Sequence, residues 1–419
     1  MRFAVLREFV LAGVLVGSGI AIGCAPPASP ARAPAGGADP IMSVAAGAYA
    51  GYAVLADGHV WAWGDDLEGQ IGDTGPWSSR TVPAEVQGLS GVISVAGSGN
   101  SAFALRRDGE VWAWGDDSED QLADGRFTDR QLPGVVPKLT AVREIAAGAF
   151  TVYAIRDDGT VWAWGDNSFG QLGSGSSGQM PTVPQKVVRL TDVVAIRSGT
   201  SDAYALRADG TVWVWGDDSL DQLGGAACGS APAGHHGVCA GSAVPNQVPG
   251  LSGMVAIAAG GDSGYALRRD GSVWAWGDDE FGELGNGVRR FDVGSPVRVR
   301  GLHDVVAITA GACSAYALLR NGTVWAWGRG DFGQLGNGSI SEERVPVRVK
   351  GLTGVVQVVG GGSTVLALER DRSPWSWGAN AFGQLGNNSV VNRDLPVRVL
   401  GLPGSPRPGK TQPDARPAG

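Results

Sequence analysis

Apolar and polar positions along the chain alternate in short runs and show no helical period. One stretch illustrates the pattern with the runs DVVAITAG, SAYALLR, TVWAWG and PVRVKGL, which lie between residues 304 and 352. Each run is short, alternating or β-branched, and bounded by Gly, Pro, Asp or Asn, which is typical of β-strands. An Asp-Gly or Asn-Gly pair separates the second and third runs in six such units, and these pairs tolerate the positive φ angles of a tight hairpin turn. The seventh unit has DRSP, with Pro374, at this point and predicts a looser hairpin.

The whole unit is repeated seven times. The second tryptophan of each VWAWG-like motif recurs at spacings of 51, 50, 51, 61, 51 and 50 residues, at Trp63, Trp114, Trp164, Trp215, Trp276, Trp327 and Trp377. Four strands in about 50 residues, seven times over, predict an all-β protein, a seven-bladed β-propeller of four-stranded blades that spans residues 41–402. Fourteen of the 15 tryptophans lie in this motif, so we expect them to pack between blades. Residues 41–47 and 396–402 are the candidate strands for ring closure, in a register that the repeat leaves open.

The segments ALRRDGSVWAWGDDEFGELGNG (266–287) and ALLRNGTVWAWGRGDFGQLGNG (317–338) resemble repeats of the regulator of chromosome condensation family. The resemblance covers residues 41–402 and implies a seven-bladed propeller. The family includes a nuclear exchange factor, a plant ultraviolet-B photoreceptor and secreted bacterial inhibitors. The loops before the second strands lack the tryptophans and arginines that a photoreceptor would need, and an acidic chain with an export signal disfavours the nuclear exchange factor.

The first 40 residues differ from the repeats. Arg2 and Arg7 precede about 15 mostly apolar residues that end in AIGC, so residues 1–23 resemble a bacterial lipoprotein signal with Cys24 as the lipid acceptor. Simple secretion and an uncleaved anchor are the alternatives. The Ala/Pro-rich residues 24–40 and residues 403–419 are typical of a disordered tether and tail. These features predict a cell-envelope location, with a membrane contact through the lipid only.

Composition and spacing indicate no enzyme. The four histidines form no acid–base group with a nucleophile, and His59 and His303 fall in turns. The Asp pairs that follow WG are expected to form turns, with calcium binding as the alternative. The longer fourth unit holds Cys228, His235, His236 and Cys239, for which a Cys228–Cys239 disulfide is favoured over a zinc site. Cys313 is expected to be a free thiol. We therefore predict no catalytic residue, metal or cofactor.

The topology of a four-stranded blade places the first–second and third–fourth connections on one side of the ring. The acidic residues gather in these connections, and most arginines gather on the opposite side. The acidic side also carries aromatic residues that could form a protein-binding face, namely Tyr49, Trp77, Phe127, Phe150 and Phe291. Packing of each ring under its own loop is the alternative.

Together these features predict a monomeric protein-interaction module. Its protein ligand is unknown, and the formal net charge of −8 argues against nucleic acid. The alternative functions are a secreted inhibitor-like propeller, a structural envelope protein, an enzyme with its site at the central channel, and an exchange factor.

Overall fold

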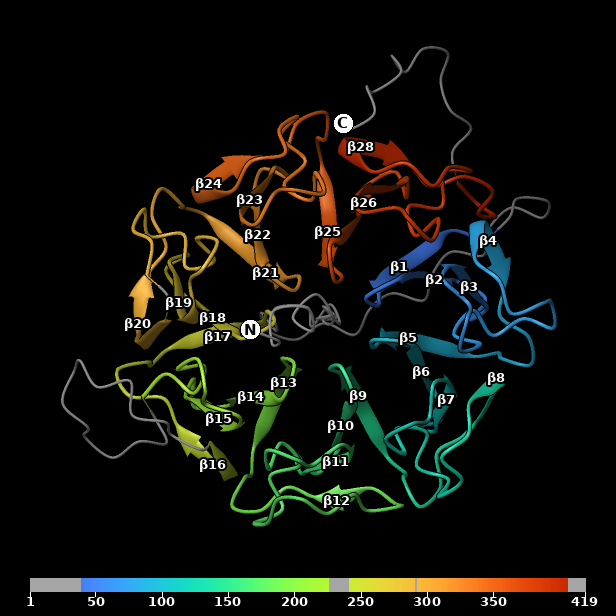
Figure 1. Cartoon of the computed structure of the whole chain (residues 1–419), viewed down its shortest axis with the longest axis horizontal. Coiled ribbons are helices and arrows are strands. Elements are labelled where there is room, and N and C mark those ends of the chain that lie inside the picture. The colour runs from blue at the N-terminus through green and yellow to red at the C-terminus, as the bar shows by residue number, and fades with distance from the viewer. Residues whose placement is uncertain (1–38, 226–240, 291, 406–419) are drawn as a thin grey trace, which may run out of the picture.

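The computed structural model describes residues 39–225, 241–290 and 292–405, and it consists of β-strands, turns and loops (Figure 1). The strands form seven antiparallel sheets of four, which confirms the predicted seven-bladed propeller. The first three blades comprise β1 Ile41–Ala46, β2 Ala50–Leu55, β3 Val60–Gly64, β4 Arg80–Glu85; β5 Val92–Gly97, β6 Ser101–Arg106, β7 Val111–Gly115, β8 Arg130–Val135; and β9 Val142–Ala147, β10 Thr151–Arg156, β11 Val161–Gly165, β12 Gln185–Lys186.

The other four blades comprise β13 Val193–Ser198, β14 Asp202–Arg207, β15 Val212–Gly216, β16 Ser242–Gln247; β17 Met254–Ala259, β18 Ser263–Arg268, β19 Val273–Asp278, β20 Asp292–Arg298; β21 Val305–Ala310, β22 Ser314–Leu319, β23 Val324–Gly328, β24 Glu343–Arg348; and β25 Val355–Gly360, β26 Thr364–Glu369, β27 Pro374–Gly378, β28 Arg393–Arg398. The first strand of each blade lies at the centre of the ring and the fourth at its rim (Figure 1). No helix in the described part of the chain is long and apolar enough to span a membrane.

Each sequence repeat forms one complete blade, so no blade combines the two ends of the chain. Strand β1 pairs with β2 in the first blade, and β28 pairs with β27 in the seventh. Blades 7 and 1 are therefore joined by non-covalent contacts, which include the backbone hydrogen bond from the Asn388 N–H to the Thr81 carbonyl at 2.9 Å. The Gln357 amide on β25 accepts a hydrogen bond from the backbone N–H of Val44 and donates one to its carbonyl, both at 3.0 Å. This amide closes the ring by bonding an inner strand of the neighbouring blade as a backbone would.

The second tryptophan of each motif is fully buried at the junction with the preceding blade. Its indole Nε1 donates to a backbone carbonyl of that blade, and the same bond recurs at all seven junctions. At the closure, Trp63 donates to the Gln384 carbonyl at 2.9 Å. In five blades a tyrosine hydroxyl reaches the equivalent carbonyl from within its own blade, as Tyr52 does to Gln70. The motif thus combines a large buried ring with a polar handle that ties neighbouring blades together.

The hairpin turns differ in detail from the predicted two-residue turn. In the first blade Gly58 N–H bonds the Leu55 carbonyl and Leu55 N–H bonds the His59 carbonyl, and only Gly58 has a positive φ, +85°. This is a four-residue turn that ends in one left-handed residue. The Asp57 carboxylate accepts from the His59 N–H, which explains the acidic residue. The expectation of a looser seventh hairpin was wrong, because the turn keeps both backbone bonds and Arg372 takes the left-handed position at φ 69°.

Candidate functional site: the loop face

One side of the disc is formed by two sets of loops, which we call the loop face. The short first–second connections lie nearest the axis, and the long third–fourth connections, here the 3–4 loops, lie outside them (Figure 1). The described 3–4 loops comprise residues 65–79, 116–129, 166–184, 217–225 with 241, 279–290, 329–342 and 379–392. Each begins directly after the tryptophan strand, so the repeat fixes its position on the ring.

An Asp or Asn near the start of six of these loops holds the loop together. Its side-chain oxygen accepts a hydrogen bond from the backbone N–H five residues later, as Asp117 does from Leu122 at 2.8 Å. Asn167 makes the same bond to Leu172 at 3.1 Å. These contacts confirm the prediction that the Asp pairs form turns. Because Asn serves equally well, the turn requires the oxygen and not the charge.

Several of these carboxylates are buried, and the same loops contain fewer arginine and lysine residues than acidic ones. Burial raises the pKa of Asp66, Asp117 and Asp218 to about 6 each. For Glu68, burial and then the neighbouring Asp129 raise the pKa to about 7. Carboxyl groups with a pKa of about 6 are still mostly ionised at pH 7, and Asp and Glu outnumber Lys and Arg in the 3–4 loops. The loop face therefore carries negative charge and is electrostatically complementary to cationic surfaces.

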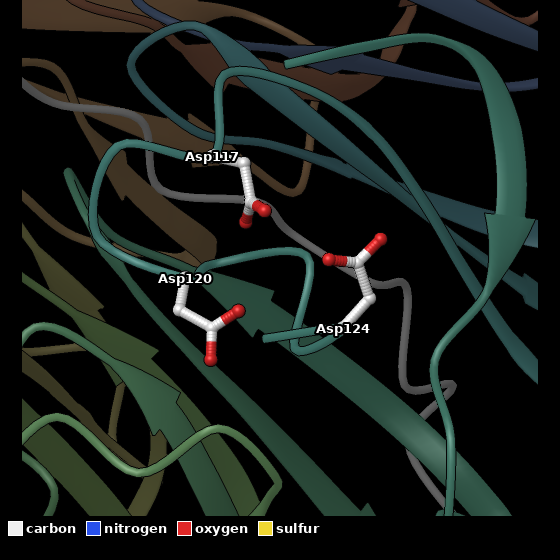
Figure 2. A group of neighbouring side chains, drawn as sticks. All are labelled: Asp117, Asp120 and Asp124. Atoms are coloured by element: carbon white, nitrogen blue, oxygen red, sulfur yellow. The ribbon is translucent and has the colours of Figure 1, made fainter. Parts of the chain in front are cut away.

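The strongest concentration of carboxylates lies in the 3–4 loop of blade 2 (Figure 2). Oxygen atoms of Asp117, Asp120 and Asp124 lie within 4.8 Å of one another, and the three side chains point toward one another. Backbone N–H groups bond Asp117 and Asp120, and Arg130 pairs with Asp124 at 3.3 Å. Three carboxylates at this separation could hold a divalent cation. Their present bonds are those of a capped loop with two arginine counter-ions, Arg130 and, at 4.0 Å from Asp124, Arg126.

Exposed apolar side chains crowd the same loops. Trp77, Phe127 and Phe169 are 45%, 44% and 47% exposed although each is large and apolar. Exposed apolar side chains also occur elsewhere in the 3–4 loops, at Leu67, Met180, Val288, Ile340, Val390 and Val391. None of these side chains is needed to fill the interior. Large apolar groups left in water beside charged loops are the composition of a protein-binding surface.

The aromatic residues named from the sequence do not all share this environment. Tyr49 is half-buried and packs edge-on against Phe382 of blade 7, with ring centroids 5.3 Å apart. Phe150 is also half-buried. Trp77 and Phe127 are exposed, whereas Phe291 lies outside the described residues. The first two rings thus contribute at most part of their surface to the face.

Phe169 is not among the residues named from the sequence, and phenylalanine recurs at the same position in blades 5, 6 and 7. The equivalent residues Phe281 and Phe332 flank the Arg329 guanidinium, at 5.1 and 5.4 Å from the two ring centroids. Such contacts hold these rings against the loops. Asp217 and Asp278 occupy the place of Arg329 in blades 4 and 5, and Asp166 occupies it in blade 3. The absence of an arginine beside Phe169 in the sequence was the available signal.

Other candidate groups carry no recognisable chemistry. His59 lies 3.0 Å from Asp57 at a hairpin turn, and His303 lies in an inter-blade turn, so neither joins an acid–base group among the described residues. Cys313 is a free thiol whose pKa burial raises further above its usual range. The predicted lipid site Cys24 and the predicted disulfide of Cys228 and Cys239 lie outside the described residues, as do His235 and His236.

The opposite side of the disc carries arginines, several of which stack on tryptophan rings. Guanidinium groups lie over the first tryptophan of several motifs, as Arg156 does over Trp162 at 4.2 Å and Arg268 over Trp274 at 4.7 Å. These contacts cover the tryptophan nearest the hairpin. The arginines of this side therefore have a packing role in addition to their charge.

The fold and this site define the class of protein as a seven-bladed β-propeller with an acidic, aromatic-bearing loop face. The family model described as the RCC1-like domain matches residues 24–313, and that of the regulator of chromosome condensation (RCC1) repeat matches residues 321–368 and 375–409. The chain belongs to this family.

Relatives of the chain have varied names. It is 30% identical over 73% of its length to human E3 ubiquitin-protein ligase HERC2, of which it covers 6%. It is 32% identical over 72% of its length to the mitochondrial RCC1 domain-containing protein RUG3 of Arabidopsis thaliana, of which it covers 57%. The crystal structure of human WBSCR16 superposes with a TM-score of 0.69 at 23% identity, over 81% of this chain and 94% of that one. Yeast RCC1 (Prp20) bound to Kap60 superposes with a TM-score of 0.67 at 24% identity, over 77% and 78% of the two chains.

Proposed function

We propose that this chain is an exported, lipid-anchored propeller that binds a protein partner through its loop face. The observation that carries the proposal is the group of exposed apolar side chains in the 3–4 loops, of which Trp77, Phe127 and Phe169 are the largest. Burial of such rings by a partner is the main source of affinity in protein interfaces. The surrounding carboxylates, some with a pKa raised by burial, favour a partner surface that brings lysine or arginine side chains.

The binding proposal is tested with a cross-linking pull-down from the native cell envelope. The test variant replaces Trp77, Phe127 and Phe169 by alanine. The matched control replaces Val82, Leu132 and Val345, which are similarly exposed at 39%, 42% and 40% but lie on the rim strands β4, β8 and β24. Both variants are first checked for the wild-type circular dichroism spectrum and melting temperature.

The proposal predicts one dominant partner that is lost from the loop variant and kept by the rim variant. Retention of the partner by the loop variant would place the interface elsewhere. Failure to recover a partner with the wild-type chain would favour a structural envelope protein. A recovered hydrolase whose activity falls on binding would identify the inhibitor-like function instead of a passive scaffold.

Export and anchoring rest on residues 1–24 and are tested separately. Replacement of Cys24 by serine should move the protein from the detergent phase to the aqueous phase of a Triton X-114 extraction. The wild-type N-terminal peptide should begin at Cys24 and carry the mass of attached acyl chains. Recovery of an unmodified peptide that begins upstream of Cys24 would refute lipidation.

A further inference from the structure

Every 3–4 loop has a glutamine or glutamate at one repeated position near its start. The seven residues are Gln70, Gln121, Gln171, Gln222, Glu283, Gln334 and Gln384. In all seven, one side-chain oxygen accepts the backbone N–H of the residue two places earlier, at distances between 2.7 and 3.0 Å. The shared bond shows that these side chains have the same orientation in each blade.

The second arm of the side chain is a hydrogen-bond donor in three blades. Nε2 of Gln121 donates to Asp116 at 2.9 Å, and Nε2 of Gln171 donates to Asp166 at 2.8 Å. The same bond from Gln222 to Asp217 measures 3.3 Å. The aspartate in each case is the first residue after the tryptophan strand. In blades 2, 3 and 4 this position therefore places a donor opposite a carboxylate.

Blade 5 has a glutamate where blades 2, 3 and 4 have this donor. Oε2 of Glu283 accepts the N–H of Phe281 at 2.8 Å, so Oε1 takes the place of the amide nitrogen. The aspartate at the equivalent position is Asp278. Glu283 is 1% exposed, and its Oε1 has no hydrogen-bond partner among the described residues. An ionised Glu283 could offer only a second negative oxygen to Asp278.

We infer that Glu283 is protonated and donates its proton from Oε1 toward the Asp278 carboxylate, so that blade 5 holds a carboxyl pair sharing one proton. A protonated carboxyl group has one O–H donor and reproduces the bond that glutamine makes in blades 2, 3 and 4. A buried carboxyl group beside a second carboxylate does not ionise readily, because burial and the like charge both disfavour its charged form. In agreement, burial and then the charge of Asp278 raise the pKa of Glu283 well above its usual range.

Other charged and titratable groups lie around Glu283, in its own blade and in blade 6. Asp279 of its own loop adds negative charge that raises the pKa of Glu283 further. The Tyr265 hydroxyl from β18 donates to the backbone carbonyl of Glu283 at 3.0 Å. From blade 6, the Cys313 thiol is neutral because burial raises its pKa, and Arg329 lies over the Phe281 ring. Arg329 is a cation in this set, and its contacts include stacking on Phe281 and an ion pair with Asp331 at 2.7 Å.

The consequence is a pH-sensitive junction between blades 5 and 6. The Glu283 carbonyl accepts the Trp327 indole N–H at 2.6 Å, so its loop is the contact that receives blade 6. Since folding raises the pKa of Glu283, the proton bound to Glu283 stabilises the folded chain. This contribution to the unfolding free energy is fully present below the carboxyl pKa of the unfolded chain, about 4.3, and is lost as the pH rises through the folded value. Between these two values the unfolding equilibrium constant should rise about tenfold per pH unit from this group alone.

The test compares the full chain with Glu283→Gln and with the reverse change Gln171→Glu in denaturant titrations from pH 5 to pH 9. Glu283→Gln supplies the amide donor permanently, so the wild-type chain should lose stability relative to this variant as the pH rises. Gln171→Glu should acquire the same pH dependence in blade 3. The difference infrared spectrum of wild type and Glu283→Gln at pH 7 should contain the C=O band of a protonated carboxylic acid.

Parallel pH profiles of wild type and Glu283→Gln, without the protonated-acid band, would overturn the inference. Loss of wild-type stability on addition of a chelator, with Glu283→Gln unaffected, would also overturn it by showing that a cation takes the place of the proton. Neither result depends on whether the loop face binds a partner.

Discussion

The indole hydrogen bonds predict that three similar tryptophan-to-phenylalanine changes have different costs. The Gln70 carbonyl accepts from Trp114 at 2.9 Å and from the Tyr52 hydroxyl at 3.1 Å, so Trp114→Phe leaves it one donor. The Gln384 and Gln121 carbonyls accept only from Trp63 and Trp164 among the described residues, because Leu366 and Phe103 take the place of the tyrosine in blades 7 and 2. Trp63→Phe and Trp164→Phe therefore leave a buried carbonyl without a partner.

The magnitude follows from what the three changes share. All three rings are fully buried, so each change removes a similar volume and should cost about 2–4 kcal/mol in packing. An unsatisfied buried acceptor adds about 1–3 kcal/mol for Trp63→Phe and Trp164→Phe only. Trp63→Phe should be the most damaging, because no chain connection joins blades 7 and 1.

The assay is denaturant unfolding followed by far-ultraviolet circular dichroism, since the changes alter tryptophan fluorescence directly. With equal slopes, the midpoints should fall in the order Trp114→Phe, Trp164→Phe, Trp63→Phe, the last lowest. A Trp114→Phe midpoint as low as that of Trp164→Phe would refute the argument that the tyrosine hydroxyl compensates for the lost indole donor.

Three further changes test other parts of the structure. Ala123 has φ 54° at a position where the other six repeats have glycine, so Ala123→Gly should raise the unfolding free energy by about 0.5–1 kcal/mol, measured by urea titration, and a loss of stability would contradict the assigned backbone strain. Asp117→Asn keeps the loop cap, as Asn167 does in blade 3, and removes a carboxyl group whose pKa is raised to about 6. It should raise the unfolding free energy by about 1 kcal/mol at pH 8 and by less at pH 4. A constant difference between the two proteins across this pH range would argue against the raised pKa. Gln357→Leu removes both bonds to Val44 and should speed amide hydrogen exchange in β1 by at least tenfold while leaving β13 unchanged, and equal exchange in β1 would show that the amide has no part in closure.

The seven blades could be predicted because the repeat is local. Each VWAWG strand lies next in sequence to the strand it pairs with, so alternation and turn residues determine both the strand and its partner. The Asp-Gly turns were placed correctly, although their geometry depends on the Asp57-type carboxylate bond to the residue two places on, which the tight-turn interpretation did not include.

The binding face could be predicted only in part, because exposure depends on contacts between repeats. Tyr49 and Phe169 are both aromatic residues in loops. Tyr49 packs on Phe382 across the ring closure, whereas Phe169 stays 47% exposed. The Glu283 position likewise looks like a neutral replacement of glutamine in the sequence. Its meaning appears only when the facing aspartate and the buried oxygen are both known.

The one-repeat, one-blade arrangement has a consequence for how the chain can be cut and rejoined. A Cβ atom on Gly404 would touch Asp39 and Pro40, so the two ends of the ring lie against each other where an inter-blade linker would run. Joining these ends and opening the chain in another inter-blade turn, such as 349–354, would leave every sheet with its four strands in sequence order. The propeller should therefore tolerate circular permutation at any of its six inter-blade turns, which would let the point where the chain enters the disc be moved around the ring without rebuilding a blade.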